Sequence, residues 1–498
     1  MLSRSVRAWG RVFPQRCNRI HFLRCVSSAA PLHSMVLDLA GKLEQPKFSV
    51  SPHDIRILSK PTQFYVTLID MIRRAQTRIF ISSLYLGSSE SELISALTEA
   101  LLKKPELEVH MLFDLNRSTR PGSLSTAKLL VPLINQFPER VHVSFFRSPN
   151  LRGLLAKLVP PRFNEGWGTW HAKIYGVDNE VMISGANLNQ SYFTDRQDRY
   201  IHFTEQHNLS QYCFDFIQTV SGFSFKLLPP ESGAFLGPHS TRENEYTITW
   251  PTPEIHPHDI HSTAELALNA LQNTYRQKRT DIHPDKVIMF PLIQAGQFNI
   301  RDEERTLTML FEHLDTLPKT NRPLLDLTSG YFGLYKEYQD LILRSSIECR
   351  IVASSPRANG FYGSRGVSGR IPEGYTLLEQ RFMSAVQRAG RESGVQLNEW
   401  EREGWTYHAK GIWLSSGEGA SPLLTLFGST NLNSRSAHID TELSFLMLAP
   451  DTFAAEALRR QLGDEIGNLR AHSKDWKGAQ RKVRLGTKAL VALVGGML

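Results

Sequence analysis

Two short segments, Trp170-His171-Ala172-Lys173 and Tyr407-His408-Ala409-Lys410, decide how this 498-residue chain is organised. Each is followed by an apolar run and then by an Asn-Leu-Asn triplet. An acid comes eleven residues after the first Asn of each triplet. The residues concerned are Asn187 and Asp198 in the first copy, and Asn431 and Glu442 in the second. Four features repeated in one order indicate a duplicated half-site.

The length and composition are those of a globular protein with more than one domain. A chain of 498 residues exceeds the size at which a single hydrophobic core stops growing. The formal charge of +8 favours anionic partners but does not separate nucleic acid from phospholipid or phosphorylated metabolites. The four cysteines show no C-x-x-C or Cys/His spacing. This argues against a disulfide framework and a structural zinc site, and we expect no metal.

Residues 1–37 have the composition of a mitochondrial transit peptide. They contain six arginines separated by Ser and apolar residues, and no acid precedes Asp38. Mitochondrial import favours this arginine-rich, acid-poor pattern, whereas a secretory signal requires an apolar region that arginines do not interrupt. We therefore predict a transit peptide over 1–37 and a mitochondrial location, at the inner membrane. Part of the positive charge then belongs to the leader.

Strands alternating with helices predict an α/β fold in both halves of the chain. In the first half, strands are expected over 78–86, 107–114 and 141–147, and helices over 62–75, 90–104 and 123–137. The second half repeats this order, with strands over 324–329 and 347–354 and helices over 336–344 and 377–389. We expect two duplicated α-β-α domains packed about a pseudo-twofold axis. Their predicted ranges are 45–230 and 260–460, joined within 228–261 and followed by a basic and apolar tail over 470–498.

The paired motifs contain the groups that phosphate-ester chemistry needs. Residues two apart on a strand point to the same face, so the His and Lys of each motif should project together. Lys ammonium groups and the amides of Asn187 and Asn431 suit the non-bridging oxygens of a phosphate. One histidine can attack phosphorus while the other protonates the leaving group. Asp198 and Glu442 can accept the far ring N–H of a histidine and so fix its tautomer.

The spacing His171-x-Lys173-x4-Asp178, extended by Asn187, resembles the signature of the phospholipase D superfamily. A lone His-x-Lys is more often an ordinary core pair, but duplication with Asn and an acid in register favours a site. The second copy has Ser415 where the signature has Asp. The resemblance implies a phosphohistidine mechanism with these catalytic residues: His171, Lys173, Asp178, His408 and Lys410. Because only the first motif is complete, we expect unequal halves and favour His171 as nucleophile, although either histidine fits the role.

Longer stretches resemble one group within the superfamily, the phosphatidyltransferases that use CDP-diacylglycerol and glycerol 3-phosphate. The resembling residues are 83–87, 151–155, 184–188, 191–200, 290–294, 359–363 and 404–411. The resemblance implies that phosphatidylglycerophosphate and CMP are formed, without a cofactor. The acceptor phosphate then needs cationic ligands, for which Arg196, Arg199 and Arg435 are candidates.

Other functions of the same superfamily stay open. Synthesis of cardiolipin or phosphatidylserine, and hydrolysis by water, would use the same catalytic residues and differ in the acceptor pocket. Cleavage of nucleic acid is disfavoured, because the sequence shows no basic–aromatic groove pattern and no nucleic-acid-binding module. An inactive protein that tethers lipids would have no chemical need for two intact His-Lys-Asn sets. The sequence does not specify an oligomeric state.

A lipid substrate requires contact with an anionic membrane, and two segments are candidates for it. Leucines recur at helical spacing over 151–159, and six basic residues precede a short apolar run in 474–498. Each segment could equally be a helix packed on the protein. No segment approaches the roughly 20 apolar residues that span a bilayer.

Overall fold

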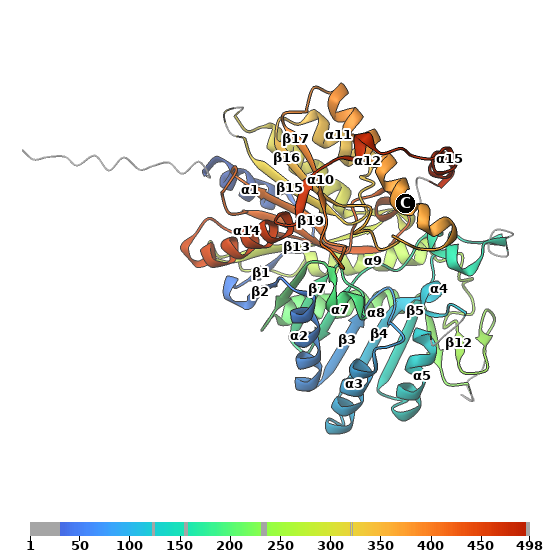
Figure 1. Cartoon of the computed structure of the whole chain (residues 1–498). Helices are drawn as coiled ribbons and strands as arrows, with labels where there is room; N and C mark the ends of the chain where they lie inside the picture. The colour runs from blue at the N-terminus through green and yellow to red at the C-terminus, as the bar shows by residue number, and fades with distance from the viewer. Residues whose placement is uncertain are drawn as a thin grey trace, which may run out of the picture.

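The computed structural model describes residues 30–121, 125–153, 158–230, 237–318, 320 and 322–494 (Figure 1). Residues 1–29 of the predicted leader and residues 154–157 of the predicted amphipathic segment lie outside this part. Residues 30–37 are in the folded protein, because helix α1 (Ala30–Lys42) packs on helix α10 (Asp302–Asp315). Leu32, Val36 and Leu39 of α1 are buried in the hydrophobic core of the second half. The folded domain therefore begins before the predicted leader ends.

The described residues form two ten-stranded sheets, one in each half of the chain. The first contains, in spatial order, β11 (Thr241–Arg242), β12 (Thr247–Thr249), β10 (Phe225–Leu228), β5 (Val141–Phe146), β4 (Glu108–Asp114), β3 (Arg78–Ser82), β6 (Ile174–Val177), β7 (Glu180–Ser184), β9 (Tyr200–Phe203) and β2 (Ile55–Leu58). The second contains β1 (Phe48–Val50), β13 (Val287–Ala295), β21 (Glu442–Leu448), β20 (Leu424–Gly428), β19 (Lys410–Ser415), β15 (Leu324–Ser329), β16 (Glu348–Ser354), β17 (Val395–Trp400) and β22 (Ser473–Asp475), with β14 (Ile300–Arg301) beside β13.

The two sheets have the same internal order, which confirms the predicted duplication of an α/β domain. The order β5-β4-β3-β6-β7-β9-β2 in one corresponds to β17-β16-β15-β19-β20-β21-β13 in the other. In each order the first three strands are parallel. The third of them, β3 or β15, pairs antiparallel with the strand that begins at or just after the motif lysine, β6 or β19. Both motifs therefore arrive at the same place in equivalent sheets.

Helices cover both sheets, and the figure shows the two halves one above the other (Figure 1). In the first half they are α2 (Pro61–Arg74), α3 (Ser91–Lys103), α4 (Leu115–Ser118), α5 (Thr126–Gln136), α7 (Ser191–Thr194), α8 (His207–Ser221) and α9 (His261–Arg276). In the second half they are α10, α11 (Lys336–Arg344), α12 (Ile371–Arg388), α13 (Ser434–His438), α14 (Glu456–Arg470) and α15 (Leu485–Val494). Their apolar stripes make the cores; α2, for example, buries Phe64, Leu68 and Ile72 at helical spacing.

Strands β1, β11 and β12 depart from the domain ranges expected from the sequence. Residues 48–50, expected in the first domain, form β1 and pair with β13 of the second sheet. Residues 241–249, expected in the join, form β11 and β12 at the edge of the first sheet. Each sheet therefore gains an edge strand from a segment expected elsewhere, and such long-range pairing does not show in the local periodicity of the sequence.

Arg199 crosses between the halves and is buried, with 2% of its surface exposed. Its Nε and Nη2 donate to the two carboxylate oxygens of Glu465 at 2.9 and 2.8 Å, and its Nη1 donates to the Leu426 carbonyl at 2.8 Å. The guanidinium also lies 3.7 Å from the ring centroid of Trp413. The donors of Arg199 are engaged in joining the two halves, so the structure does not favour the predicted role of Arg199 in substrate binding.

Removing Arg199 should destabilise the protein strongly. In Arg199→Leu the buried carboxylate of Glu465 loses its partner, and loss of one member of a buried pair costs about 3–5 kcal/mol. The free energy of unfolding from urea titration measures the effect. Arg74→Leu is the matched control, because Arg74 is half exposed in its pairs with Asp70 and Glu180 and such pairs contribute about 0.2–1 kcal/mol. Equal losses in the two variants would contradict this role for Arg199.

Candidate active site

Two short parallel pairings hold each His-x-Lys segment against the acid-bearing segment of the other half. In one, the Trp170 bridge to Thr441 includes a bond from His171 N to the Thr441 carbonyl at 2.9 Å. In the other, β18 (Thr406–Tyr407) pairs with β8 (Arg196–Gln197), and His408 N donates to the Gln197 carbonyl at 2.8 Å. The backbone register therefore places each histidine beside the acid that follows its partner segment.

His171 is oriented by Glu442 of the opposite half. The Nδ1 atom of His171 lies 3.0 and 2.9 Å from the two carboxylate oxygens of Glu442. Two hydroxyls also donate to this carboxylate, one from Ser429 and one from Ser436, the latter at 2.7 Å. With Nδ1 directed at the carboxylate, the Nε2 atom of His171 is the one available for chemistry.

His408 is oriented by Asp198, and here a lysine also takes part. Its Nδ1 lies 2.6 Å from Asp198 Oδ2 and 2.7 Å from Nζ of Lys410. Lys410 and its counterpart Lys173 each donate to the carbonyl of their own motif histidine, but among the described residues only Lys410 also contacts a ring nitrogen. Only His408 therefore has a cation beside Nδ1, and the two halves differ at the atom that sets the histidine tautomer.

The prediction that these acids can orient histidines is matched by the geometry, and each acid contacts the histidine of the other half. The strands begin later than expected: β6 starts at Ile174, so His171 and Lys173 lie just before it. The extended backbone that brings them together comes from the pairing between halves rather than from the sheet.

Burial shifts the charges in this site towards neutrality. It lowers the pKa of Lys173 to about 7 and that of Lys410 to about 8. Burial also lowers the pKa of both histidines, for His171 against the opposing effect of Glu442 and for His408 together with the charges of Lys410 and Arg196. Burial alone would raise the pKa of Glu442, but His171, Lys173 and Ser429 outweigh it and hold that pKa at about 2. Without a ligand, the histidines are therefore neutral.

The two asparagines lie in the site with unlike partners. Asn187 Nδ2 donates to the Tyr192 hydroxyl at 3.1 Å, and that hydroxyl is 3.4 Å from Nε2 of His408. Asn431 is buried, and its Oδ1 has no hydrogen-bond partner among the described residues. Burying a carbonyl oxygen without a hydrogen-bond partner is unfavourable unless a ligand donates a hydrogen bond to it. This favours contact between Asn431 and the substrate.

Aromatic and cationic side chains that the motifs did not reveal complete the wall around His408. Tyr192 and Tyr331 lie edge-on to its ring, with centroids 5.1 and 5.4 Å away. The Arg196 guanidinium lies 4.5 Å from the Tyr192 ring, and its Nε donates to Thr406 Oγ1 at 2.9 Å. The structure thus places the candidate ligand Arg196 at the site. The sequence signal for Tyr331 is the repeat of Ser83-Leu84-Tyr85 as Ser329-Gly330-Tyr331 at the ends of equivalent strands.

Arg435 lies beside the site, but its side chain already has partners. Its Nε and Nη2 donate to the two carboxylate oxygens of Asp440 at 3.2 and 3.0 Å, and Nη2 also donates to the Glu165 carbonyl at 3.0 Å. Asp440 in turn accepts from Thr169 N at 2.9 Å. These contacts position the segment before His171, and substrate binding by Arg435 stays a prediction.

Asp178 lies outside the site, so the structure does not favour the catalytic role predicted for it. It follows β6, at the far end of that strand from His171 and Lys173, and adopts a left-handed conformation with φ of 51°. Its carboxylate accepts from the backbone N–H groups of Gln76, Thr77 and Arg78 at 2.8–3.0 Å. The physical role of Asp178 is to cap the start of β3. Ser415 makes no such set of contacts and donates to the Gly417 carbonyl instead.

Comparison with known proteins identifies the family. The model of the cardiolipin synthase, PLD-like domain matches residues 68–218. A protein of Schizosaccharomyces pombe named CDP-diacylglycerol–glycerol-3-phosphate 3-phosphatidyltransferase is 35% identical over 90% of this chain and 95% of its own. The human protein of that name, described as mitochondrial, is 34% identical over 90% of this chain and 84% of its own.

This chain belongs to the CDP-diacylglycerol–glycerol-3-phosphate 3-phosphatidyltransferase family. The resemblance read from the sequence is thereby confirmed. A crystal structure of phosphatidylserine synthase from Haemophilus influenzae shares the fold, with a TM-score of 0.66 and 20% identity over 93% of this chain and 98% of that one. The predicted phospholipase D-like architecture is therefore confirmed as well.

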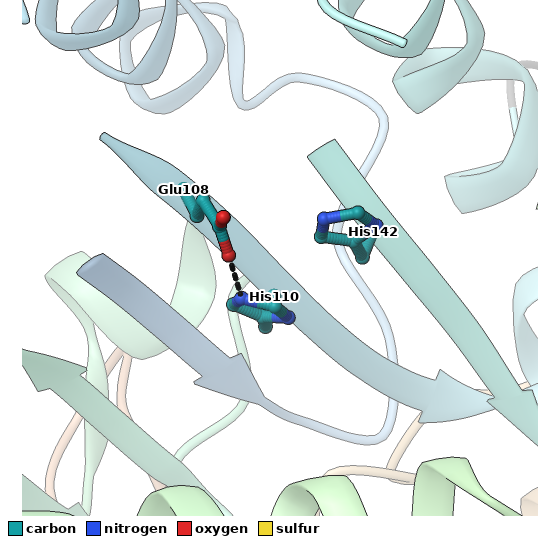
Figure 2. A group of neighbouring side chains, drawn as sticks. All are labelled: Glu108, His110 and His142. Atoms are coloured by element: carbon teal, nitrogen blue, oxygen red, sulfur yellow. Dashed lines mark hydrogen bonds and ion pairs between the residues drawn. The ribbon is translucent and has the colours of Figure 1, made fainter. Parts of the chain in front are cut away.

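A second group of titratable side chains in this phosphatidyltransferase lies on the first sheet, away from the His-x-Lys motifs. Glu108 and His110 of β4 and His142 of β5 place one ligand atom each within 4.8 Å of one another (Figure 2). The two imidazole rings are nearly parallel, with centroids 4.8 Å apart, and His110 Nε2 lies 3.0 Å from the Glu108 carboxylate. Lone pairs of stacked rings do not converge, so both rings would have to turn before one ion could bind all three.

Replacing Glu442 by Gln should separate orientation from burial at His171. The variant keeps the shape but loses the carboxylate that fixes Nδ1–H, so kcat of the phosphatidyltransferase should fall by about 10²–10⁴. The carboxylate opposes the lowering of the His171 pKa, and without it that pKa falls further. Since the acidic limb of the pH–rate profile follows protonation of this base, the limb should move to lower pH.

Glu180→Gln is the control for this experiment. Glu180 forms a similar contact with His202, at 3.2 Å, outside the site. The control should keep the parent kcat and pH profile. An unchanged acidic limb in Glu442→Gln would show that Glu442 does not act on a catalytic histidine.

Proposed function

We propose that this protein transfers the phosphatidyl group of CDP-diacylglycerol to the primary hydroxyl of glycerol 3-phosphate, forming phosphatidylglycerophosphate and CMP. The observation that carries the proposal is the pair of cross-half contacts, His171–Glu442 and His408–Asp198, in a chain 35% identical to a relative named for this reaction. Two oriented histidines among lysines and asparagines suit a double displacement at phosphorus. The pair explains why one half alone makes no complete site.

In the first step, Nε2 of His171 attacks the phosphorus that carries the diacylglycerol. A P–N bond forms, the P–O bond to CMP breaks, and the electron pair leaves with the CMP oxygen. His171 suits this role because Glu442 holds Nδ1 and leaves a lone pair on Nε2. It is also the more open of the two rings, at 9% exposure against 3% for His408.

His408 suits the role of proton donor. The anionic donor favours a protonated His408, whose Nδ1–H is held by Asp198 Oδ2 at 2.6 Å; its Nε2–H passes to the leaving oxygen and leaves a neutral ring. In the second step the same Nε2 takes the proton of the glycerol 3-phosphate hydroxyl. The new P–O bond forms as the P–N bond to His171 breaks, which restores both histidines.

The lysines and asparagines would bind the phosphate oxygens as charge develops on them. Lys173 and Lys410 are both buried, and their ammonium groups are worth more there than in water. We assign Lys173, Lys410, Asn187 and Asn431 to this role. Arg196 is the candidate for the acceptor phosphate, because it lines the site beside Tyr192 and is only half buried.

The relatives support a mitochondrial location, and we propose association with the inner membrane. The human, chicken and mouse relatives are all described as mitochondrial. Among the described residues no helix combines the length and the apolar character needed to cross a bilayer. We propose a peripheral enzyme whose arginine-rich N-terminal segment, predicted as a leader over 1–37, is the import signal.

The acceptor panel tests the reaction. Purified protein with CDP-diacylglycerol should release CMP rapidly with glycerol 3-phosphate and on the order of 10²-fold more slowly with glycerol, since each lost charge-assisted hydrogen bond costs about 1.5–3 kcal/mol. Serine, phosphatidylglycerol and water complete the panel and represent the other phosphatidyl transfers. Faster CMP release with any of these three would assign the protein a different acceptor.

Trapping with donor labelled in the phosphatidyl group tests the division of labour. Without acceptor, His408→Ala should still accumulate label on the protein, more slowly than the parent, whereas His171→Ala should accumulate none. Acid lability of the label, together with its location on the peptide that contains His171, identifies a P–N bond. Label retained in His171→Ala and lost in His408→Ala would reverse the two roles.

A further inference from the structure

Six exposed apolar side chains lie on segments of both halves that lead to the site. In the second half they are Tyr362, Val367, Leu485 and Leu493, and in the first half Leu158 and Phe163. Leu485 and Leu493 of α15 are 82% and 84% exposed. Large apolar side chains left this open in one region mark an interaction surface.

Helix α15 is tied to the wall of the site through the first turn of α12. The Arg484 side chain and Thr487 hydroxyl both donate to Glu373 of that turn at 2.9 Å. Tyr375, in the same turn, lies 5.6 Å from the ring of Tyr331, which itself lies 5.4 Å from His408. One turn of helix thus separates α15 from the side chains that line the site.

The other exposed side chains lie on segments that also reach the site. Phe361, next to Tyr362, lies 6.0 Å from the Tyr331 ring. Val367 belongs to the short helix Gly366–Arg370 that leads into α12. On the first half, Phe163 lies in the short helix Pro161–Trp167, whose Glu165 carbonyl accepts from Arg435. Exposed apolar groups of both halves therefore lie on segments that contact the side chains around the site.

The positive charge next to α15 indicates that the surface binds an anionic partner. The segment 474–488 contains six basic residues and one acid, Asp475, and ends in the apolar helix. Arg481 and Arg484 are paired with Glu399 and Glu373, and the other four basic residues are exposed lysines. A basic segment joined to exposed leucines fits the surface of an anionic bilayer, where the leucines enter the acyl region and the basic groups meet the headgroups. A protein partner would need no such excess of positive charge.

We propose that α15, with the exposed apolar side chains at 158–163 and 362–367, is the surface by which the protein docks on an anionic membrane. This inference rests on the proposed function, since the donor is a lipid whose two acyl chains stay in the bilayer. Docking here turns the site towards the bilayer, so that the phosphate of the donor reaches His171 without extraction of its chains. The opposite edge of the second half, which carries α14, faces away (Figure 1).

Vesicle flotation tests the docking surface directly. Leu485→Glu/Leu493→Glu should bind vesicles of phosphatidylcholine with phosphatidylglycerol at least roughly tenfold more weakly than the parent, because burial of each leucine is lost. Phe453→Glu is the matched control: Phe453 is 92% exposed but lies before α14, and its replacement should leave binding unchanged. Equal loss in both variants, or in neither, would overturn the proposal.

Activity on two donors separates this proposal from the reaction itself. The double variant should lose activity on long-chain CDP-diacylglycerol in vesicles and keep it on a water-soluble short-chain donor. Parent protein inactive on both donors would remove the proposed function while leaving the flotation result to stand. A double variant folded by circular dichroism and equally impaired on the soluble donor would place α15 in the site rather than on a membrane.

Discussion

The buried contact between a histidine of one half and a carboxylate of the other is the constraint on which the architecture depends. His171 with Glu442 and His408 with Asp198 are four side chains with at most 9% of their surface exposed. Burying such groups is unfavourable unless each has a partner in good geometry. Two sheets of equal strand order, locked by backbone pairing at Thr441 and Gln197, provide that geometry twice. Neither half could satisfy its own histidine.

The two duplicated domains share their fold, but they differ in the residues that surround the acid of each half-site. At equivalent positions, Gly185 lies where a Cβ would be 2.5 Å from Asp198 Oδ1, while Ser429 donates to Glu442. Lys410 therefore lies close to Asp198, whereas the Glu442 carboxylate accepts hydrogen bonds from serine hydroxyls. The consequence is one histidine with a carboxylate alone at Nδ1 and one with a carboxylate and an ammonium. Because Asp178 lies outside the site, the completeness of the first motif is no ground for assigning the nucleophile.

The sequence predicted the elements and motifs that depend on local pattern, and failed where a side chain serves a distant partner. Strands 324–329 and helix 336–344 agree with β15 and α11 residue for residue, because their periodicity is local. Arg199 and Arg196 are three residues apart and look alike as candidate ligands. Only the fold shows that Arg199 binds Glu465, which lies in α14 of the second half, and that Arg196 lies beside the site. The pairing of β1 with the second sheet escapes prediction for the same reason.

The low-dielectric site also determines how the charges respond to substrate. Lys173, with a pKa of about 7, is only partly protonated near neutrality because burial disfavours its charge. An anionic pyrophosphate placed among Lys173, Lys410 and Arg196 supplies the opposite charge that burial withholds, and so raises those pKa values. The free energy that binding gains from each ammonium is therefore coupled to proton uptake. In the proposed reaction, the same burial that lowers the pKa of His171 also makes the charge of the lysines depend on the bound donor, so one physical cause serves both requirements.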